Sequence, residues 1–411
     1  MVSAGPPLRY EAGPIYYASA TAENALTRLA DDLDAGRRTL PIDDRHGLLP
    51  ALLEALEVPV ESQVLNFTKL SQQKDLVGPE TPRAIYFSDD AYVGHVPGGF
   101  LEVIVSDPGL GLSFHTVDLL TWNSGGPPEV LIDREVMSCT VCHAGPRTLD
   151  VPGLLVRSVF SDETGRPALP ARDVRPDHGT PLADRFGGWY VTGTTGPARH
   201  RGNLTLPTDR PEQWDELAEN AAGRNVTDLS GRFDASAYRS PHSDVVALMT
   251  LEHQLDAHNR MVRTGYAYRI AAEAGTADEP DAAWRAEAED LLAHLLFEGE
   301  TPLDHPVTGT SGFAEAFAAR GPFDDAGRSL RQFDLETRLF RYPCSYTVHS
   351  DGFAHLPKEV RGYLYRRLYE VTHGEEFAHL SDEDRTALRE ILPAVLPELA
   401  GAWKTFVSTP F

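Results

Sequence analysis

Cys139, Cys142 and His143, in the run SCTVCHAGP, are the residues of this chain whose types and spacing most clearly point to chemistry. In a helical turn, side chains three residues apart lie on one side, so both thiols can face the same partner. Thiolate and imidazole groups are also strong protein ligands for transition metals. The segment therefore predicts a site that binds a metal or a metal-containing group.

Several kinds of site share part of this pattern. A common zinc site needs a second pair of ligands, and the one other cysteine, Cys344, does not supply it. A thioredoxin-like pair stands between a strand and a helix, whereas Gly145-Pro146 follows here at once. Three cysteines also do not form a disulfide framework. We therefore expect a c-type haem: each thiol adds to one vinyl group, and His143 ligates the iron.

The residue on the other side of the iron is less well defined. In small cytochromes c it is usually a methionine from a downstream loop, but Met249 and Met261 fall in an expected helix. His253, in the same helix, is our first candidate, as a metal ligand or as a catalytic acid or base. The alternatives are His200, His178, Met249 or no ligand.

The helix expected over 243–272 is apolar nearly all round, which predicts that it is buried. Glu252 and Asn259 fall in the middle of its apolar stripe. Because buried polar groups need partners, we expect a hydrogen-bond network there and count Glu252 among the candidate catalytic residues. His253 and His258 point about 140° apart around the helix and cannot share one metal.

The glycine-rich run GGWYVTGTTGPARHRGN over 187–203 is a candidate contact for a flat ligand. Glycine lets the backbone approach closely, and we expect Trp189 to lie against the porphyrin. Arg157 and Arg201 are candidates for bidentate pairing with the haem propionates. An ordinary turn region is the competing interpretation of this segment.

The N-terminal half contains the β-like elements that would position these residues. Short apolar runs over 83–120, separated by Pro-Gly turns, predict a small antiparallel sheet. A further strand is expected over 154–160. The long Gly/Pro-rich stretch over 161–240 is typical of functional loops wrapped around a cofactor. His95 and His115 fall in the β-like region, and we expect them to be structural.

The C-terminal half is predicted to be helical, with helices over 243–272, 279–299, 326–340, 358–372 and 381–404. Two short helices over 21–36 and 48–57 precede the sheet. No linker-like composition separates the halves. The expected fold is therefore α+β and helix-rich, a single domain over 1–411 around one haem, with a loop- and β-rich half (1–240) and a helical half (241–411).

The charge balance limits the partners. The chain has 61 acidic and 37 basic residues, a formal net charge of -24, which argues against nucleic acid and anionic membrane surfaces but permits a basic redox partner. No run approaches transmembrane length, so no membrane insertion is expected. The N-terminus lacks the pattern of a signal peptide. Because bacterial haem c is normally attached outside the cytoplasm, we expect a periplasmic or otherwise extracytoplasmic protein whose leader is absent from this sequence.

Several blocks of the chain together resemble a family of large bacterial monohaem cytochrome c-like proteins. Besides CTVCH they include YVGHVPGG, VPGLLVRSVF, GGWYVTG, HRGN and FAHLPKEVRGYLYRRL. The resemblance covers about residues 14 to 400. It implies haem c and a bacterial extracytoplasmic setting, and it does not supply a reaction.

Chain size favours an enzyme over a carrier, because 411 residues around one haem leave room for a substrate pocket. The first hypothesis is a haem-dependent oxidoreductase, peroxidase-like or related, in which His253 or His200 serves as acid or base toward a small-molecule oxidant or substrate. The second is an electron-transfer or redox-sensing cytochrome with six-coordinate haem and a partner protein.

Overall fold

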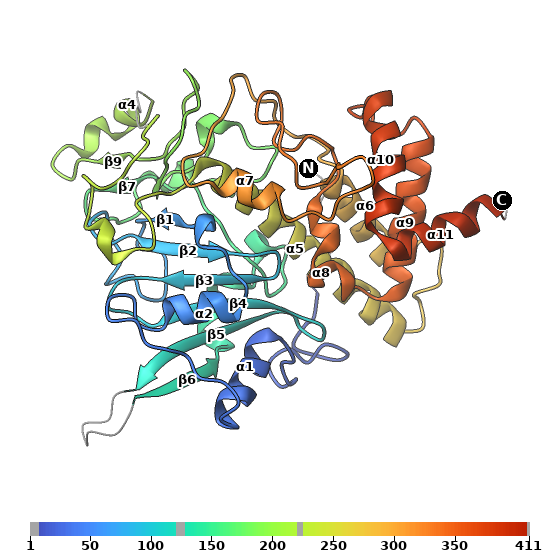
Figure 1. Ribbon diagram of the computed structural model, residues 1–411, viewed down its shortest axis with the longest axis horizontal. Helices are drawn as coiled ribbons and strands as arrows, with labels where there is room; N and C mark the ends of the chain where they lie inside the picture. Colours follow the sequence, from blue (N-terminus) through green and yellow to red (C-terminus); the bar gives the residue numbers. More distant parts are fainter. Residues whose placement is uncertain (1–7, 121–127, 220–224, 409–411) are drawn as a thin grey trace.

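The computed structural model describes residues 8–120, 128–219 and 225–408. A seven-stranded antiparallel sheet occupies the N-terminal half, and helices dominate the C-terminal half (Figure 1). This confirms the α+β class and the division between a β-containing and a helical half. None of the described helices combines the length and the apolarity that crossing a lipid bilayer requires.

The sheet is a meander with one added edge strand, in the order β6-β5-β4-β3-β2-β1-β8. Its strands are β1 (Val64–Asn66), β2 (Arg83–Phe87), β3 (Ala91–His95), β4 (Leu101–Asp107), β5 (Gly111–Leu120), β6 (Glu129–Arg134) and β8 (Trp189–Tyr190). Strands β2 to β5 confirm the predicted runs over 83–120. Strands β1 and β8 are too short to produce a sequence pattern.

The strand expected over 154–160 is wrong. That segment is extended, but its only bridge joins Ser158 to Val174 among the described residues. Instead of a neighbouring strand, the side chain of Asn259 bonds both backbone groups of Leu154. The apolar run is buried beside a helix, and burial alone does not distinguish such a segment from a strand.

Each face of the sheet packs against helices. One face, with Tyr86 and Val93, shares a core with α1 (Ala25–Asp34) and α2 (Leu49–Ala55). The other face, with Tyr92 and Phe114, belongs to the large core around α5 (Val245–Glu273). Residues of one strand therefore alternate between two cores, which explains why β3 is buried throughout.

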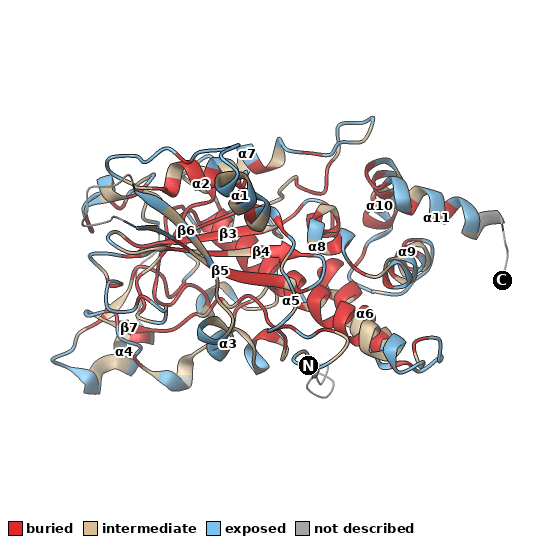
Figure 2. Ribbon diagram, turned by 90° about the horizontal axis from the view of Figure 1, so that it is seen from below, coloured by how far each residue is buried: buried red, intermediate tan, exposed pale blue. Residues whose placement is uncertain are grey.

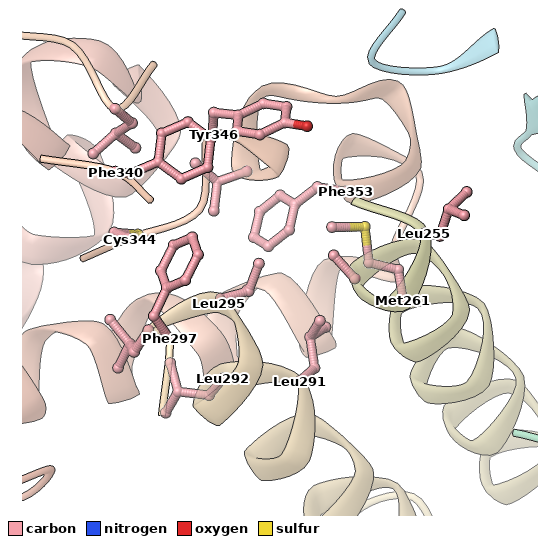
Figure 3. Close-up of a cluster of buried hydrophobic side chains, with 14 of the residues drawn as sticks. Leu255, Met261, Leu291, Leu292, Leu295, Phe297, Phe340, Cys344, Tyr346 and Phe353 are labelled. Atoms are coloured by element: carbon pink, nitrogen blue, oxygen red, sulfur yellow. The ribbon is translucent and has the colours of Figure 1, made fainter. Parts of the chain in front are cut away.

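Helix α5 runs through the centre of the molecule and is coloured as buried over most of its length (Figure 2). Every residue over 245–267 except Arg260 is buried, as its apolarity all round predicts. It begins at the N-cap Asp244, whose carboxylate accepts hydrogen bonds from two backbone N–H groups. The side chains between α5, α6 (Ala283–Leu295) and the loops that follow form a continuous apolar cluster, which includes Cys344 (Figure 3).

The remaining elements are α3 (Met137–His143), α4 (Trp214–Glu219), α7 (Phe313–Ala318), α8 (Asp351–Ala354), α9 (Lys358–His373), α10 (Asp382–Val395), α11 (Pro397–Ser408), and the parallel pair β7 (Ser161–Asp162) and β9 (Thr205–Leu206). The helix expected over 326–340 is wrong, because Phe333 and Phe340 form a bridge and stack their rings instead. The helix expected over 381–404 is divided at Leu396, where the backbone leaves the helical region.

Candidate functional site

Helix α3 carries both thiols and the histidine of the CTVCH motif in a single short helix, as the sequence predicts. It lies at the surface, where Figure 2 colours it as intermediate and exposed. Cys142 is exposed and Cys139 is partly buried. Burial raises the pKa of the Cys139 thiol to about 11, so this group is a thiol at neutral pH.

The imidazole of His143 is held in one orientation. Its Nδ1 lies 2.9 Å from the carbonyl oxygen of Gly153, which can only accept, so Nδ1 carries the proton and donates. Its ring also packs against Phe114, with centroids 5.2 Å apart. Burial lowers the pKa of His143, which favours the neutral ring. The remaining nitrogen, Nε2, therefore has a free lone pair, the arrangement found in histidines that bind metals.

A pocket opens beside α3, and we call it the α3 pocket. Its cavity volume is about 300 Å³, at the lower end of the range of about 300–1,000 Å³ that is usual for small-molecule sites. Its floor is the sheet face that carries Ile85, Ile104 and Phe114. Further lining residues are Asn66, Leu70, Ser71, Gln72, Arg83, Glu102, Val103, His115, Thr116, Ser138, Cys139, Cys142, His143, Leu155, Arg157 and Trp189.

An ion pair crosses the floor of the α3 pocket. Arg83 on β2 reaches Glu102 on β4 and passes over β3 at Gly94. A Cβ atom at Gly94 would lie 2.5 Å from the Arg83 guanidinium, so a larger residue there would force the Arg83 side chain to shift. Both charged groups act electrostatically on Cys139 and His143. Arg83 and Glu102 were not selected from the sequence, although they lie on β2 and β4, on either side of β3, at positions that a correct sheet topology would align.

Two of the predicted cofactor-binding residues lie at this pocket. Trp189 and Arg157 both line it, together with the CTVCH residues. They are linked, because the Trp189 indole N–H donates to the Arg157 carbonyl at 2.8 Å. The Arg157 guanidinium already pairs with Asp173, 3.2 Å from Nε to the carboxylate. The structure thus brings together five of the residues that the sequence selected.

Two other candidates do not line the pocket. His200 is buried, accepts a hydrogen bond from the Gly202 N–H at 3.0 Å and packs edge-on against Phe186. Arg201 pairs with Asp184 and lies over the ring of Phe160. The expectation that His200 and Arg201 contact the same ligand as His143 is therefore not met by their positions.

The structure also places His253 and Glu252 away from the α3 pocket. His253 is fully buried, and its Nδ1 lies 3.0 Å from Nδ1 of His178. Glu252 pairs with Arg185 at 3.2 Å, and burial raises its pKa to about 8. These positions correct the expectation that His253 faces His143: the two lie in different parts of the core. Met249, the fallback ligand, is likewise a buried core residue outside the pocket lining.

His178, His253 and His294 form a second group of candidate ligands. Of these three, His294 was not selected from the sequence. We call these three buried residues the histidine cluster; one nitrogen of each ring lies within 4.8 Å of the others. Burial lowers the pKa of all three rings, so they are neutral. His294 was missed because a single histidine in the apolar run DLLAHLLF looks like an ordinary core residue.

No protein family, no curated protein and no solved structure matches this chain.

Proposed function

We propose that the α3 pocket binds one haem covalently, through thioethers to Cys139 and Cys142 and an iron bond to Nε2 of His143. Each thiol would add across one vinyl C=C bond, with sulfur and hydrogen going to its two carbons, so that no oxidant is consumed. The observation that carries the proposal is the fixed orientation of His143, whose Nδ1 donates to Gly153 and leaves Nε2 available beside both thiols.

The lining of the α3 pocket fits a large, flat group with charged edges. Ile85, Ile104, Phe114 and Leu155 supply apolar surface, and Trp189 supplies an aromatic one. The Arg157 guanidinium is suited to bind a carboxylate such as a haem propionate. To do so, it would either leave its present partner Asp173 or bind both carboxylates at once.

We infer a haem-dependent oxidoreductase rather than an electron carrier, because the pocket lacks a good second iron ligand. Among the described residues that line it there is no methionine, and the one histidine besides His143 is His115. Nε2 of His115 lies 2.9 Å from the Ser113 hydroxyl, on the strand face that points to the opposite core. An open coordination position would let a bound haem supply redox chemistry to a small molecule.

The residues of the chain suggest how such a pocket would handle protons. The Glu102 carboxylate, paired with Arg83, is the acidic group of the pocket floor and is positioned to accept or return a proton at a carboxylate oxygen. This role replaces the one that His253, His200 and Glu252 were expected to fill. Trp189 and Phe114 would exclude water from the apolar side.

We also propose that the chain is a member of the cytochrome c-like family that its sequence resembles. The protein would then lie outside the cytoplasm, because bacteria attach haem to cysteine thiols there. The partner class is a small-molecule oxidant or substrate. An electron-transfer or redox-sensing protein with six-coordinate haem remains the second candidate, favoured by the exposed apolar side chains of Met137 and Val141, which are 76% and 82% accessible beside the motif.

The first test is coexpression of the full chain with haem-c maturation machinery, followed by haem staining of a denaturing gel. We expect covalent haem in the wild type and none in a Cys139→Ala, Cys142→Ala variant. Cys344→Ala is the matched control, because that thiol is fully buried away from the pocket, and it should retain haem. A wild-type chain that matures without haem would refute the proposal.

The second test separates the two candidate functions. The ferric spectrum should be high-spin, and cyanide should shift it, if the far side of the iron is open. A low-spin spectrum that cyanide leaves unchanged would instead establish a six-coordinate carrier. His253→Gln should leave the spectrum as in the wild type, because that residue lies outside the α3 pocket.

A further inference from the structure

We propose that the histidine cluster, His178, His253 and His294, is a binding site for one divalent transition-metal ion of the zinc class, separate from the α3 pocket. The three rings come from distant parts of the chain: a loop, the middle of α5 and the end of α6. All three are buried, and one nitrogen of each lies within 4.8 Å of the others. Imidazole is the commonest protein ligand for such ions.

The outer hydrogen bonds turn one nitrogen of each ring inward. Nε2 of His178 lies 3.2 Å from the Glu298 carbonyl, and Nε2 of His294 lies 3.1 Å from the His253 carbonyl. Carbonyls only accept, so both Nε2 atoms carry protons and both Nδ1 atoms have lone pairs. Nε2 of His253 faces the Ser345 hydroxyl at 2.7 Å, which can accept a proton in the same way. Oxygen acceptors on the outer nitrogen are typical of metal-bound histidines.

The inward nitrogens are placed as ligands of one ion would be. Nδ1 of His178 and Nδ1 of His253 are 3.0 Å apart. Two nitrogens bound tetrahedrally to zinc at the usual bond length lie about 3.3 Å from each other. A shared proton could also join these two atoms, and the rings of His253 and His294 stack with centroids 4.6 Å apart, so a neutral hydrogen-bonded stack is the competing arrangement.

His294 contributes a nitrogen that lies beside a carboxylate. Its Nε2 proton is committed to the His253 carbonyl, so its Nδ1 is an unprotonated nitrogen, and it lies 3.4 Å from the carboxylate of Asp256. A lone pair facing a carboxylate oxygen is unfavourable without a positive charge between or beside them. The arginines beside Asp256 supply such a charge in either arrangement, and a metal ion bound at Nδ1 would add to it. Asp256 also pairs with Arg175 and Arg260, which fixes its orientation.

The site has a route to solvent. A wide depression of about 1700 Å³, including open solvent, reaches His178 and His294, whereas His253 is fully buried and does not line it. Its wall is rich in carboxylates, which attract cations: Asp177, Asp184, Glu289, Asp290 and Glu298. An ion can therefore enter without unfolding of the core, as a proposed metal site requires.

The test uses the full haem-loaded chain, so that thiols and His143 are already occupied. The protein is treated with chelator, given Zn²⁺, desalted and analysed for metals by mass spectrometry, with haem iron counted separately. We expect one zinc per chain, and visible ligand-field bands when Co²⁺ replaces Zn²⁺. The Cys139→Ala, Cys142→Ala chain should bind the same zinc, which separates this result from the success or failure of haem attachment.

His178→Gln and His294→Gln should each weaken zinc binding at least tenfold, whereas His258→Gln, on α5 but outside the cluster, should not. Circular dichroism checks that each variant folds. If a cluster variant does not fold, Ser345→Ala replaces it, since it removes only the outer acceptor of His253 and should still weaken binding about tenfold. A folded wild type that binds neither Zn²⁺ nor Co²⁺, or variants that bind like the wild type, would overturn the proposal.

Discussion

Asn259 holds Leu154 by both hydrogen bonds of its amide: Oδ1 accepts from the Leu154 N–H at 2.7 Å, and Nδ2 donates to the Leu154 carbonyl at 2.8 Å. The preceding residue, Gly153, supplies the carbonyl that orients His143. A Cβ at Gly153 would lie 2.4 Å from Oδ1 of Asn259, so the segment and the side chain fit closely. The buried centre of α5 thus positions the proposed haem ligand through one intermediate segment.

Asn259→Leu should destabilise the protein by about 2–4 kcal/mol, because two buried backbone groups of Leu154 lose their partners. Chemical denaturation measures this. In haem-loaded protein the variant should also change the ferric spectrum, since His143 loses its support. Thr250→Val is the control: it removes a bond within α5, to the Val246 carbonyl, and should leave the spectrum unchanged. Equal spectra in all three proteins would contradict the positioning role of Asn259.

The Arg83–Glu102 pair gives a second prediction. Glu102→Gln leaves the Arg83 guanidinium on the pocket floor without its counter-charge, and should cost about 2–4 kcal/mol. The double variant Arg83→Met, Glu102→Gln should be closer to the wild type than the sum of the single variants. Denaturation of the four proteins in one cycle checks this. If the two losses simply add, the groups do not interact.

The three cysteines should differ in reactivity when the chain is prepared without haem. Cys142 is exposed and should react first with a thiol reagent, and Cys139 more slowly because its pKa is raised to about 11. Cys344 is fully buried with a pKa raised to about 12, and should react only on unfolding. In haem-loaded protein we expect no reaction before unfolding. Early labelling of Cys344 would show that its part of the core opens readily.

Acid should weaken the fold through His95. Burial of this side chain, together with the neighbouring His46, lowers the pKa of His95 to about 4. Between pH 6.5 and 4 the unfolded chain takes up a proton that the native chain does not, so the free energy of unfolding falls as pH falls. The contribution is about 3 kcal/mol over that range. His95→Gln should flatten the profile there, and His355→Gln, on the exposed surface, should not. Identical slopes in denaturation at several pH values would contradict this.

Local sequence patterns determined much of the architecture. The β-like runs over 83–120 became β2 to β5, and the apolarity of the 243–272 region predicted a buried helix, because strand alternation and all-round apolarity are properties of neighbouring residues. The spacing of Cys139, Cys142 and His143 likewise placed them in one short helix. Trp189 and Arg157, also selected from the sequence, line the same pocket as these residues.

Only the tertiary structure decided which distant residues meet. His253 looked like a partner for His143, but the course of α5 carries it to His178 and His294, and brings Asn259 to Leu154 instead. Arg83 and Glu102 meet only through the register of three strands. Helical and strand periodicity show which face a side chain occupies, whereas its neighbour across the core depends on how the elements pack, and that information is not local.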